Sequence, residues 1–83
     1  MLRVKGVVKE NSIHTTLFFD YQLNFRPGQF IMLWIPGVDE KPFTVSYHSK
    51  QTFGVTIESK GYYSKKAVDL KKGDLVGFRG CFG

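Results

Sequence analysis

Apolar and polar residues alternate along most of this chain with a period of two. The clearest run lies at residues 52–59, where Phe53, Val55 and Ile57 are separated by polar residues or glycine. In a β-strand, every second side chain points to the same face. The pattern therefore predicts a strand with one face in a core.

The same reasoning predicts two strands at the start of the chain, joined by a tight hairpin at residues 11–12. The first covers residues 3–10 and alternates except at Val7. Its expected shared face consists of Val4, Gly6 and Val8. The second covers residues 12–20, and its expected shared face consists of Ile13, Thr15, Leu17 and Phe19.

Two more strands are predicted in the middle of the chain. Residues 29–35 are apolar on both faces, so this strand is expected to be covered on both sides. A turn at Pro36-Gly37 ends it, and residues 37–41 are predicted to be a polar loop. The next strand, residues 42–47, alternates again. It is expected to set Phe43, Val45 and Tyr47 opposite Thr44 and Ser46.

The alternation stops at residues 61–70. There Tyr63, Ala67 and Leu70 are spaced for one face of a helix, so a short helix is predicted. A turn follows, and residues 74–78 are predicted to be the last strand. Six short antiparallel strands in a small chain favour an all-β, closed or nearly closed barrel, because closure removes exposed sheet edges.

Composition narrows the class of partner. Hydrophobic residues make up 42% of the chain, which argues against disorder. The formal net charge is +5, and residues 50–83 hold seven Lys and Arg against three acids. This basic part could face nucleic acid, an anionic cofactor or an acidic partner, or it could be a solvated face.

The only cysteine, Cys81, cannot form an internal disulfide or supply a cysteine-based metal site, so no metal is predicted. A single cysteine favours a reducing, cytoplasmic compartment. No signal peptide is expected. No membrane span is expected either, because the longest apolar stretch, residues 30–36, is far below the ~20 residues of a span.

Catalytic side chains find little support in the sequence. His14 and His48 have no neighbouring nucleophile, and both are expected to be exposed polar residues. Asp39 and Glu40 are adjacent in the predicted loop, a spacing that favours solvation over acid–base work. We therefore predict no catalytic residue.

Phosphate binding is the better hypothesis at the predicted helix start. Gly61 and the Ser64 hydroxyl lie there, and helix N-termini offer free N–H groups to phosphates. Charge could come from Lys60, Lys65 and Lys66. The alternative is a capped helix with solvated lysines.

A second candidate segment is EKPFTVS. Lys41 could meet a phosphate, Pro42 fixes the backbone, Phe43 offers a flat face, and Thr44 offers a hydroxyl. A flavin needs a stacking surface, a polar contact near its reactive nitrogen and cations for its phosphates. The alternative is an ordinary strand start with Phe43 in the core.

Four motifs in order, PGQF, EKPFTVS, GYYS and KKGDLVGFRGCFG, resemble the flavin-binding barrel of the ferredoxin reductase superfamily. More narrowly, they are similar to the electron transfer subunits of dihydroorotate dehydrogenase. The resemblance spans Val4 to Gly83. It implies a six-stranded antiparallel Greek-key barrel with one short helix before the last strand. It also implies FAD as cofactor, with FMN as the alternative.

The resemblance assigns roles to both candidate segments. Lys41 would meet the cofactor phosphate, Phe43 would pack against the isoalloxazine or its chain, and Thr44 would sit near flavin N5. The rest of that strand's cofactor-binding set is Pro42, Val45 and Ser46. The second segment would bind pyrophosphate through backbone N–H groups of Gly61, Tyr62, Tyr63 and Ser64.

The sequence departs from the family pattern at three positions. Lys41 stands where most members have Arg, and Lys cannot make Arg's bidentate phosphate contact. Phe43 replaces the usual Tyr and so lacks its hydroxyl. Cys81 stands in the Pro position of a Gly-Pro-x-Gly ending. One cysteine cannot hold an iron–sulfur cluster, so none is predicted in this chain.

The resemblance implies an electron transfer domain of an NAD(P)-linked oxidoreductase of pyrimidine biosynthesis. Residues 1–83 would form one flavin-binding domain that ends where a nucleotide-binding domain would begin, and it would be inactive as a reductase alone. The expected partner is an NAD(P)-binding domain or a catalytic dehydrogenase subunit in another chain, with a homo-oligomer also open.

Two other functional classes stay open. A small basic barrel could bind nucleic acid by stacking bases on exposed aromatic side chains. The candidates are Phe18, Tyr21, Tyr47, Tyr62 and Tyr63. The other class is a degenerate barrel without a cofactor. The family resemblance favours flavin over both.

Overall fold

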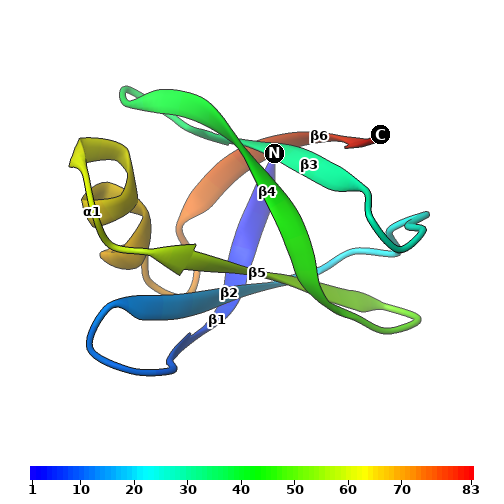
Figure 1. Cartoon of the computed structure of the whole chain (residues 1–83), viewed down its shortest axis with the longest axis horizontal. Helices are drawn as coiled ribbons and strands as arrows, with labels where there is room; N and C mark the ends of the chain where they lie inside the picture. The colour runs from blue at the N-terminus through cyan, green and yellow to red at the C-terminus, as the bar shows by residue number, and fades with distance from the viewer.

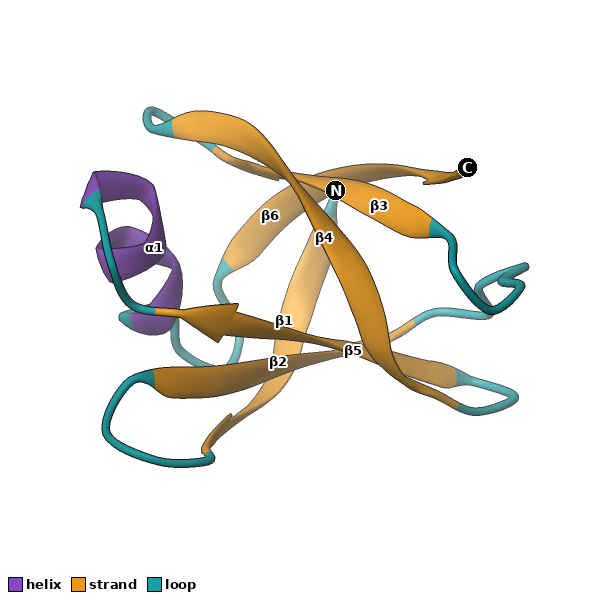
Figure 2. Ribbon diagram, in the orientation of Figure 1, coloured by secondary structure: helices purple, strands orange, loops and turns teal.

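Six strands and one helix form in the order that the alternation predicts. The computed structural model describes residues 1–83 (Figures 1 and 2). The elements are β1 (Leu2–Lys9), β2 (His14–Asp20), β3 (Phe30–Ile35), β4 (Asp39–His48), β5 (Thr52–Glu58), α1 (Tyr62–Val68) and β6 (Leu75–Phe82). The structure contains no helix with the length and hydrophobicity needed to span a membrane.

The strands close into an antiparallel barrel in the order β1-β2-β5-β4-β3-β6, which confirms the predicted Greek-key barrel. After β2, the chain crosses through residues 21–29 to reach β3, and β6 closes the barrel between β3 and β1. In Figure 1, α1 lies at one end of the barrel, and residues 21–29 and the C-terminus lie at the other. The two ends therefore offer separate surroundings for ligands.

The barrel interior is filled by the inward side chains of all six strands. Phe53, Val55 and Ile57 are fully buried, as their alternation predicts. The helix covers one end of this core with Tyr63 and Ala67, both buried, which confirms two of the three positions predicted for its apolar face. The third, Leu70, lies beyond the end of the helix at Val68 and is partly buried against the core. The other fully buried side chains include Val4, Leu17, Phe19, Ile31, Leu33 and Val76.

The predicted face of β1 is wrong because a β-bulge interrupts the strand. Val4 pairs with Phe19 but Gly6 pairs with Phe18, so the register shifts between them. A bulge inserts one extra residue and reverses the alternation beyond it. Val7 therefore packs against the core, whereas Val8 is 46% exposed.

Three predictions for the middle strands also need correction. The outer face of β3 is not covered, since Trp34 on it is 42% exposed. The predicted polar loop at 37–41 is too long, because Asp39–Lys41 pair with β3 as the start of β4. Glu40 is held there by two hydrogen bonds from Arg79 of β6, at 3.0 and 2.9 Å. Tyr47 does not share the core face, because the register shifts after Val45.

The last strand extends to Phe82, four residues beyond its predicted end. Its glycines permit close approach rather than a turn. A Cβ on Gly77 would lie 2.7 Å from Cε3 of Trp34, so the indole ring rests directly on this glycine. Gly80 has a φ of 129° at a register shift against β3.

Replacing Gly77 with alanine is expected to displace the Trp34 ring and to cost about 1–3 kcal/mol of unfolding free energy. The new methyl would overlap the ring at 2.7 Å. The measurement is urea unfolding followed by tryptophan fluorescence, with a red shift expected in the folded state. Gly6→Ala is the matched control, because a Cβ there meets nothing within 4 Å. Equal stability of the two variants would contradict the assigned packing.

Candidate functional site

A cavity of about 700 Å³ lies between the start of β4, the end of β5 and the start of α1. β4 and β5 are antiparallel neighbours, so the start of one lies beside the end of the other. This arrangement brings the two candidate segments of the sequence together. The lining consists of Val38, Asp39, Lys41, Pro42, Phe43, Thr56, Glu58, Lys60, Gly61, Tyr62, Tyr63 and Ser64.

Seven of the predicted site residues line this cavity, and three do not. The seven are Lys41, Pro42, Phe43, Gly61, Tyr62, Tyr63 and Ser64. Val45 is buried in the core, and Thr44 is exposed beside Phe30 of β3. The Ser46 hydroxyl accepts a hydrogen bond from Thr56 Oγ1 at 2.9 Å. Their roles toward a cofactor stay predictions.

Two aromatic rings form one wall of the cavity. Phe43 and Tyr63 are stacked, with ring centroids 5.8 Å apart and planes 26° apart. The Tyr63 hydroxyl donates a 2.7 Å hydrogen bond to the Leu33 carbonyl, so it is not free for a ligand. Burial, with the nearby Asp39 and Glu40 carboxylates, raises the pKa of Tyr63. Tyr63 therefore positions Phe43 and the helix.

Ser64 shapes the turn before α1. Its Oγ accepts hydrogen bonds from the N–H groups of Lys60 and Gly61, both at 2.8 Å, and donates to the Gly61 carbonyl at 3.1 Å. The hydroxyl is thus used inside the turn rather than offered to a phosphate. The first N–H groups of a helix have no intrahelical partner, so Tyr62 and Tyr63 present theirs at this end.

The lining carries two cations and two carboxylates. Lys41 Nζ lies 3.8 Å from Asp39 Oδ2, and the pair is largely exposed. Glu58 lies on the next strand, 3.7 Å from His14 Nε2. Lys60 is in no ion pair. The predicted charge from Lys65 and Lys66 is not part of the lining.

Sequence reasoning missed the acidic and hydroxyl part of this site. Asp39, Thr56 and Glu58 were not among the predicted site residues. Thr56 and Glu58 occupy alternate positions of β5, opposite its buried face. That alternation, combined with the pairing of β5 to β4, was the signal that could have found them.

The contribution of Tyr63 to stability is expected to fall at high pH. Its folded-state pKa is raised from 10.0, so the unfolded chain loses this proton first as the pH rises. The contribution is complete below the unfolded-state pKa of about 10 and declines above it, by about 1.4 kcal/mol per pH unit. The Tyr63→Phe variant loses about 1 kcal/mol of hydrogen bonding near neutral pH. Because phenylalanine has no ionisable hydroxyl, the stability of this variant lacks the decline at high pH that comes from Tyr63. Urea unfolding of both proteins at about pH 8 and about pH 11 tests it, and a constant difference would refute it.

The chain is similar in sequence to archaeal proteins named as the probable electron transfer subunit of dihydroorotate dehydrogenase B (NAD(+)). It is 44% identical over 81 residues to the protein of Methanocaldococcus jannaschii, covering 98% of this chain and 30% of that one. It is 38% identical over 82 residues to the protein of Thermoplasma volcanium, covering 99% and 32%. The chain thus spans less than a third of the length of these curated relatives. No protein-family model matches it.

Solved structures show the same fold at low identity. One is the NADH-dependent reduced ferredoxin-NADP oxidoreductase, described in terms of flavin-based electron bifurcation. It has a TM-score of 0.87 at 18% identity, covering 98% of this chain and 32% of that one. The other is the cytochrome b5 reductase domain of Ulva prolifera nitrate reductase. It has a TM-score of 0.84 at 17% identity, covering 99% and 40%. The chain is therefore similar over nearly its whole length to one part of these electron transfer subunits, and it has the barrel fold of both solved structures.

Proposed function

We propose that this chain binds a flavin, with FAD favoured over FMN, in the cavity between β4, β5 and α1. One observation carries the proposal. The segments around Lys41 and Gly61, twenty residues apart in sequence, line one cavity of about 700 Å³.

The residues of the cavity fit a flavin nucleotide. Its volume of about 700 Å³ lies within the range of ~300–1,000 Å³ typical of small-molecule sites. Lys41 and Lys60 supply positive charge for phosphates, and a Cβ on Gly61 would meet nothing within 4 Å, so the turn has open space beside it. The half-buried ring of Phe43 supplies an aromatic surface.

Each group then has a distinct task. Lys41 and Lys60 neutralise the phosphates, and the N–H groups of Tyr62 and Tyr63 add hydrogen bonds to them. Phe43 packs against the ring or its chain. Thr44 does not line the cavity, but it follows Phe43 on the outer face of β4, where it would be the polar contact near N5 of a ring that extends beyond the cavity. Val45 and Ser46 would complete that strand's part of the site. A bound flavin supplies one- and two-electron redox chemistry, which the protein only positions.

The names of the relatives extend the proposal to electron transfer. Residues 1–83 would act as the flavin-binding domain of an NAD(P)-linked oxidoreductase of pyrimidine biosynthesis. An NAD(P)-binding domain or a dehydrogenase subunit in another chain would be the partner. These 83 residues alone are not expected to oxidise NADH steadily, because no nucleotide-binding domain is among them.

Titration of the purified chain with FAD and FMN tests the proposal. A bound flavin should change the visible absorbance and flavin fluorescence and should saturate at one equivalent, with FAD the tighter of the two. A parallel titration with a labelled single-stranded oligonucleotide separates the nucleic-acid class. Titrations in which neither FAD nor FMN changes the absorbance or the fluorescence would refute the proposal. If only the oligonucleotide binds, with an affinity that falls as the salt concentration rises, the chain belongs to the nucleic-acid-binding class.

A further inference from the structure

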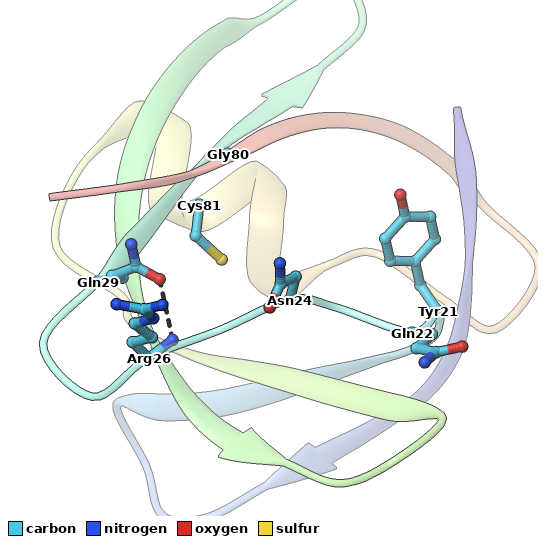
Figure 3. Close-up of a pocket in the computed structure, with 7 residues that line it drawn as sticks. All are labelled: Tyr21, Gln22, Asn24, Arg26, Gln29, Gly80 and Cys81. Carbon is cyan, nitrogen blue, oxygen red and sulfur yellow. Dashed lines mark hydrogen bonds between the residues drawn. The ribbon is translucent and has the colours of Figure 1, made fainter.

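A second cavity, of about 360 Å³, lies where residues 21–29 approach the end of β6 (Figure 3). Figure 1 shows this segment at the end of the barrel opposite α1. Its lining consists of Tyr21, Gln22, Asn24, Arg26, Gln29, Gly80 and Cys81. No residue is shared with the lining of the larger cavity. What binds here is therefore a separate question from flavin binding.

The segment that forms this cavity is extended and alternates between two environments. Leu23 is buried in the core and Phe25 is half-buried against it, with its ring 5.2 Å from that of His48. The His48 ring donates a 2.8 Å hydrogen bond from Nε2 to the Leu23 carbonyl. Because Leu23 and Phe25 are turned toward the core, the polar side chains at the alternate positions before, between and after them lie on the opposite side of the segment. They are Gln22, Asn24 and Arg26.

The rest of the cavity wall is also held in place. The Tyr21 ring packs edge-on against Phe78 of β6, with centroids 4.9 Å apart. Gln29 Oε1 accepts a 2.9 Å hydrogen bond from the N–H of Arg26, drawn as a dashed line in Figure 3. Figure 3 also shows the Cys81 sulfur directed from β6 toward Asn24. The segment is thus held by contacts on both sides, which fixes where its polar side chains emerge.

The chemistry of the lining favours an anion. Arg26 is the only charged residue in it, and the guanidinium is in no ion pair. No carboxylate lines the cavity. The remaining side chains are three amides and a phenol, which donate and accept hydrogen bonds, and the thiol of Cys81. An arginine fork matches a planar carboxylate in a bidentate fashion.

We propose that this cavity binds a small organic carboxylate, with Arg26 holding the carboxylate group and the amide of Asn24, which Figure 3 places nearest to it on the same segment, bonding to its other polar groups. The volume of about 360 Å³ lies near the lower end of the range of small-molecule sites. A hydroxylated carboxylate such as malate fits this set of partners better than acetate, which has no further polar group. The proposal does not depend on flavin binding.

The test uses Cys81 as a reporter, because it is the only cysteine in the chain. Alkylation of the full chain by iodoacetamide is followed at mildly alkaline pH, since burial raises the pKa of the Cys81 thiol. Malate, acetate and inorganic phosphate are titrated as probes, and ¹H–¹⁵N spectra locate the affected amides. Malate is expected to slow alkylation, to bind more tightly than acetate or phosphate, and to shift amides within residues 21–29.

Two matched variants test whether malate binding depends on the charge of Arg26. Arg26→Gln is expected to weaken malate binding about tenfold or more, because a charge-assisted hydrogen bond is lost. Lys9→Gln removes the same charge from β1 outside the cavity and should leave the affinity unchanged. Spectra of both variants must show the folded barrel. No protection by malate, equal weakening in both variants, or equally tight binding of phosphate would each overturn the proposal.

Discussion

Replacing Phe53 with alanine is expected to remove about 3–5 kcal/mol of unfolding free energy. Phe53 is fully buried, and its ring centroid lies 5.2 Å from that of Phe19 and 5.6 Å from that of Phe78. These rings come from β5, β2 and β6, so one truncation opens a cavity where three strands meet. The total free energy of unfolding of a domain of this size is about 4–12 kcal/mol, so this substitution would remove a large share of it.

Urea unfolding followed by circular dichroism measures this loss. The matched control is Phe82→Ala, since Phe82 lies at the end of β6 and is partly exposed. It should cost clearly less than Phe53→Ala. Similar costs for the two variants would contradict the assignment of Phe53 to the centre of the core.

Replacing Lys41 with glutamate is expected to weaken flavin binding about 100-fold or more. A hydrogen bond to a charged group contributes about 1.5–3 kcal/mol, which is roughly 10–100-fold in affinity, and charge reversal adds repulsion. Lys41 is one of two cations in the cavity lining, and Asp39 Oδ2 already lies 3.8 Å from it. Reversal would leave three carboxylates around one lysine.

Flavin fluorescence titrations of the variant and of Lys65→Glu form a matched pair. Lys65 is an exposed residue of α1, close in sequence to the same cavity but not part of its lining. Both variants change the net charge equally, so long-range effects cancel. If Lys65→Glu weakened binding as much as Lys41→Glu, a specific phosphate contact at Lys41 would be disproved.

Much of the barrel followed from alternation alone. Phe53, Val55 and Ile57 lie in the core as predicted, because period two is a direct consequence of strand geometry. The core face of β1 was predicted wrongly because of the bulge after Val4. The only local sign of that bulge is Val7, which breaks the alternation, and one such break does not by itself indicate a bulge. The predicted last strand stops four residues before Phe82, because glycines are compatible with a turn or with close backbone approach, and only the packing of Gly77 against Trp34 and of Gly80 against β3 decides between them.

The candidate site was predicted in part for a similar reason. The family resemblance predicts that Lys41 and Gly61 belong to one site, and the pairing of β4 with β5 brings them together. The use of the Ser64 hydroxyl within its own turn depends on a local backbone geometry that composition does not reveal. The contributions of Thr56 and Glu58 depend on which strands are neighbours, which a single strand's pattern cannot show.

Mapping FAD onto assigned ¹H–¹⁵N amide spectra of the full chain tests the central claim most directly. If the cavity between β4, β5 and α1 is the flavin site, amides of residues 41, 43 and 61–64 should shift together and saturate at one common affinity. Amides of residues 22–26, at the other end of the barrel, should stay unchanged. Shifts confined to one of the two segments, shifts at residues 22–26 instead, or no shifts at all would contradict it.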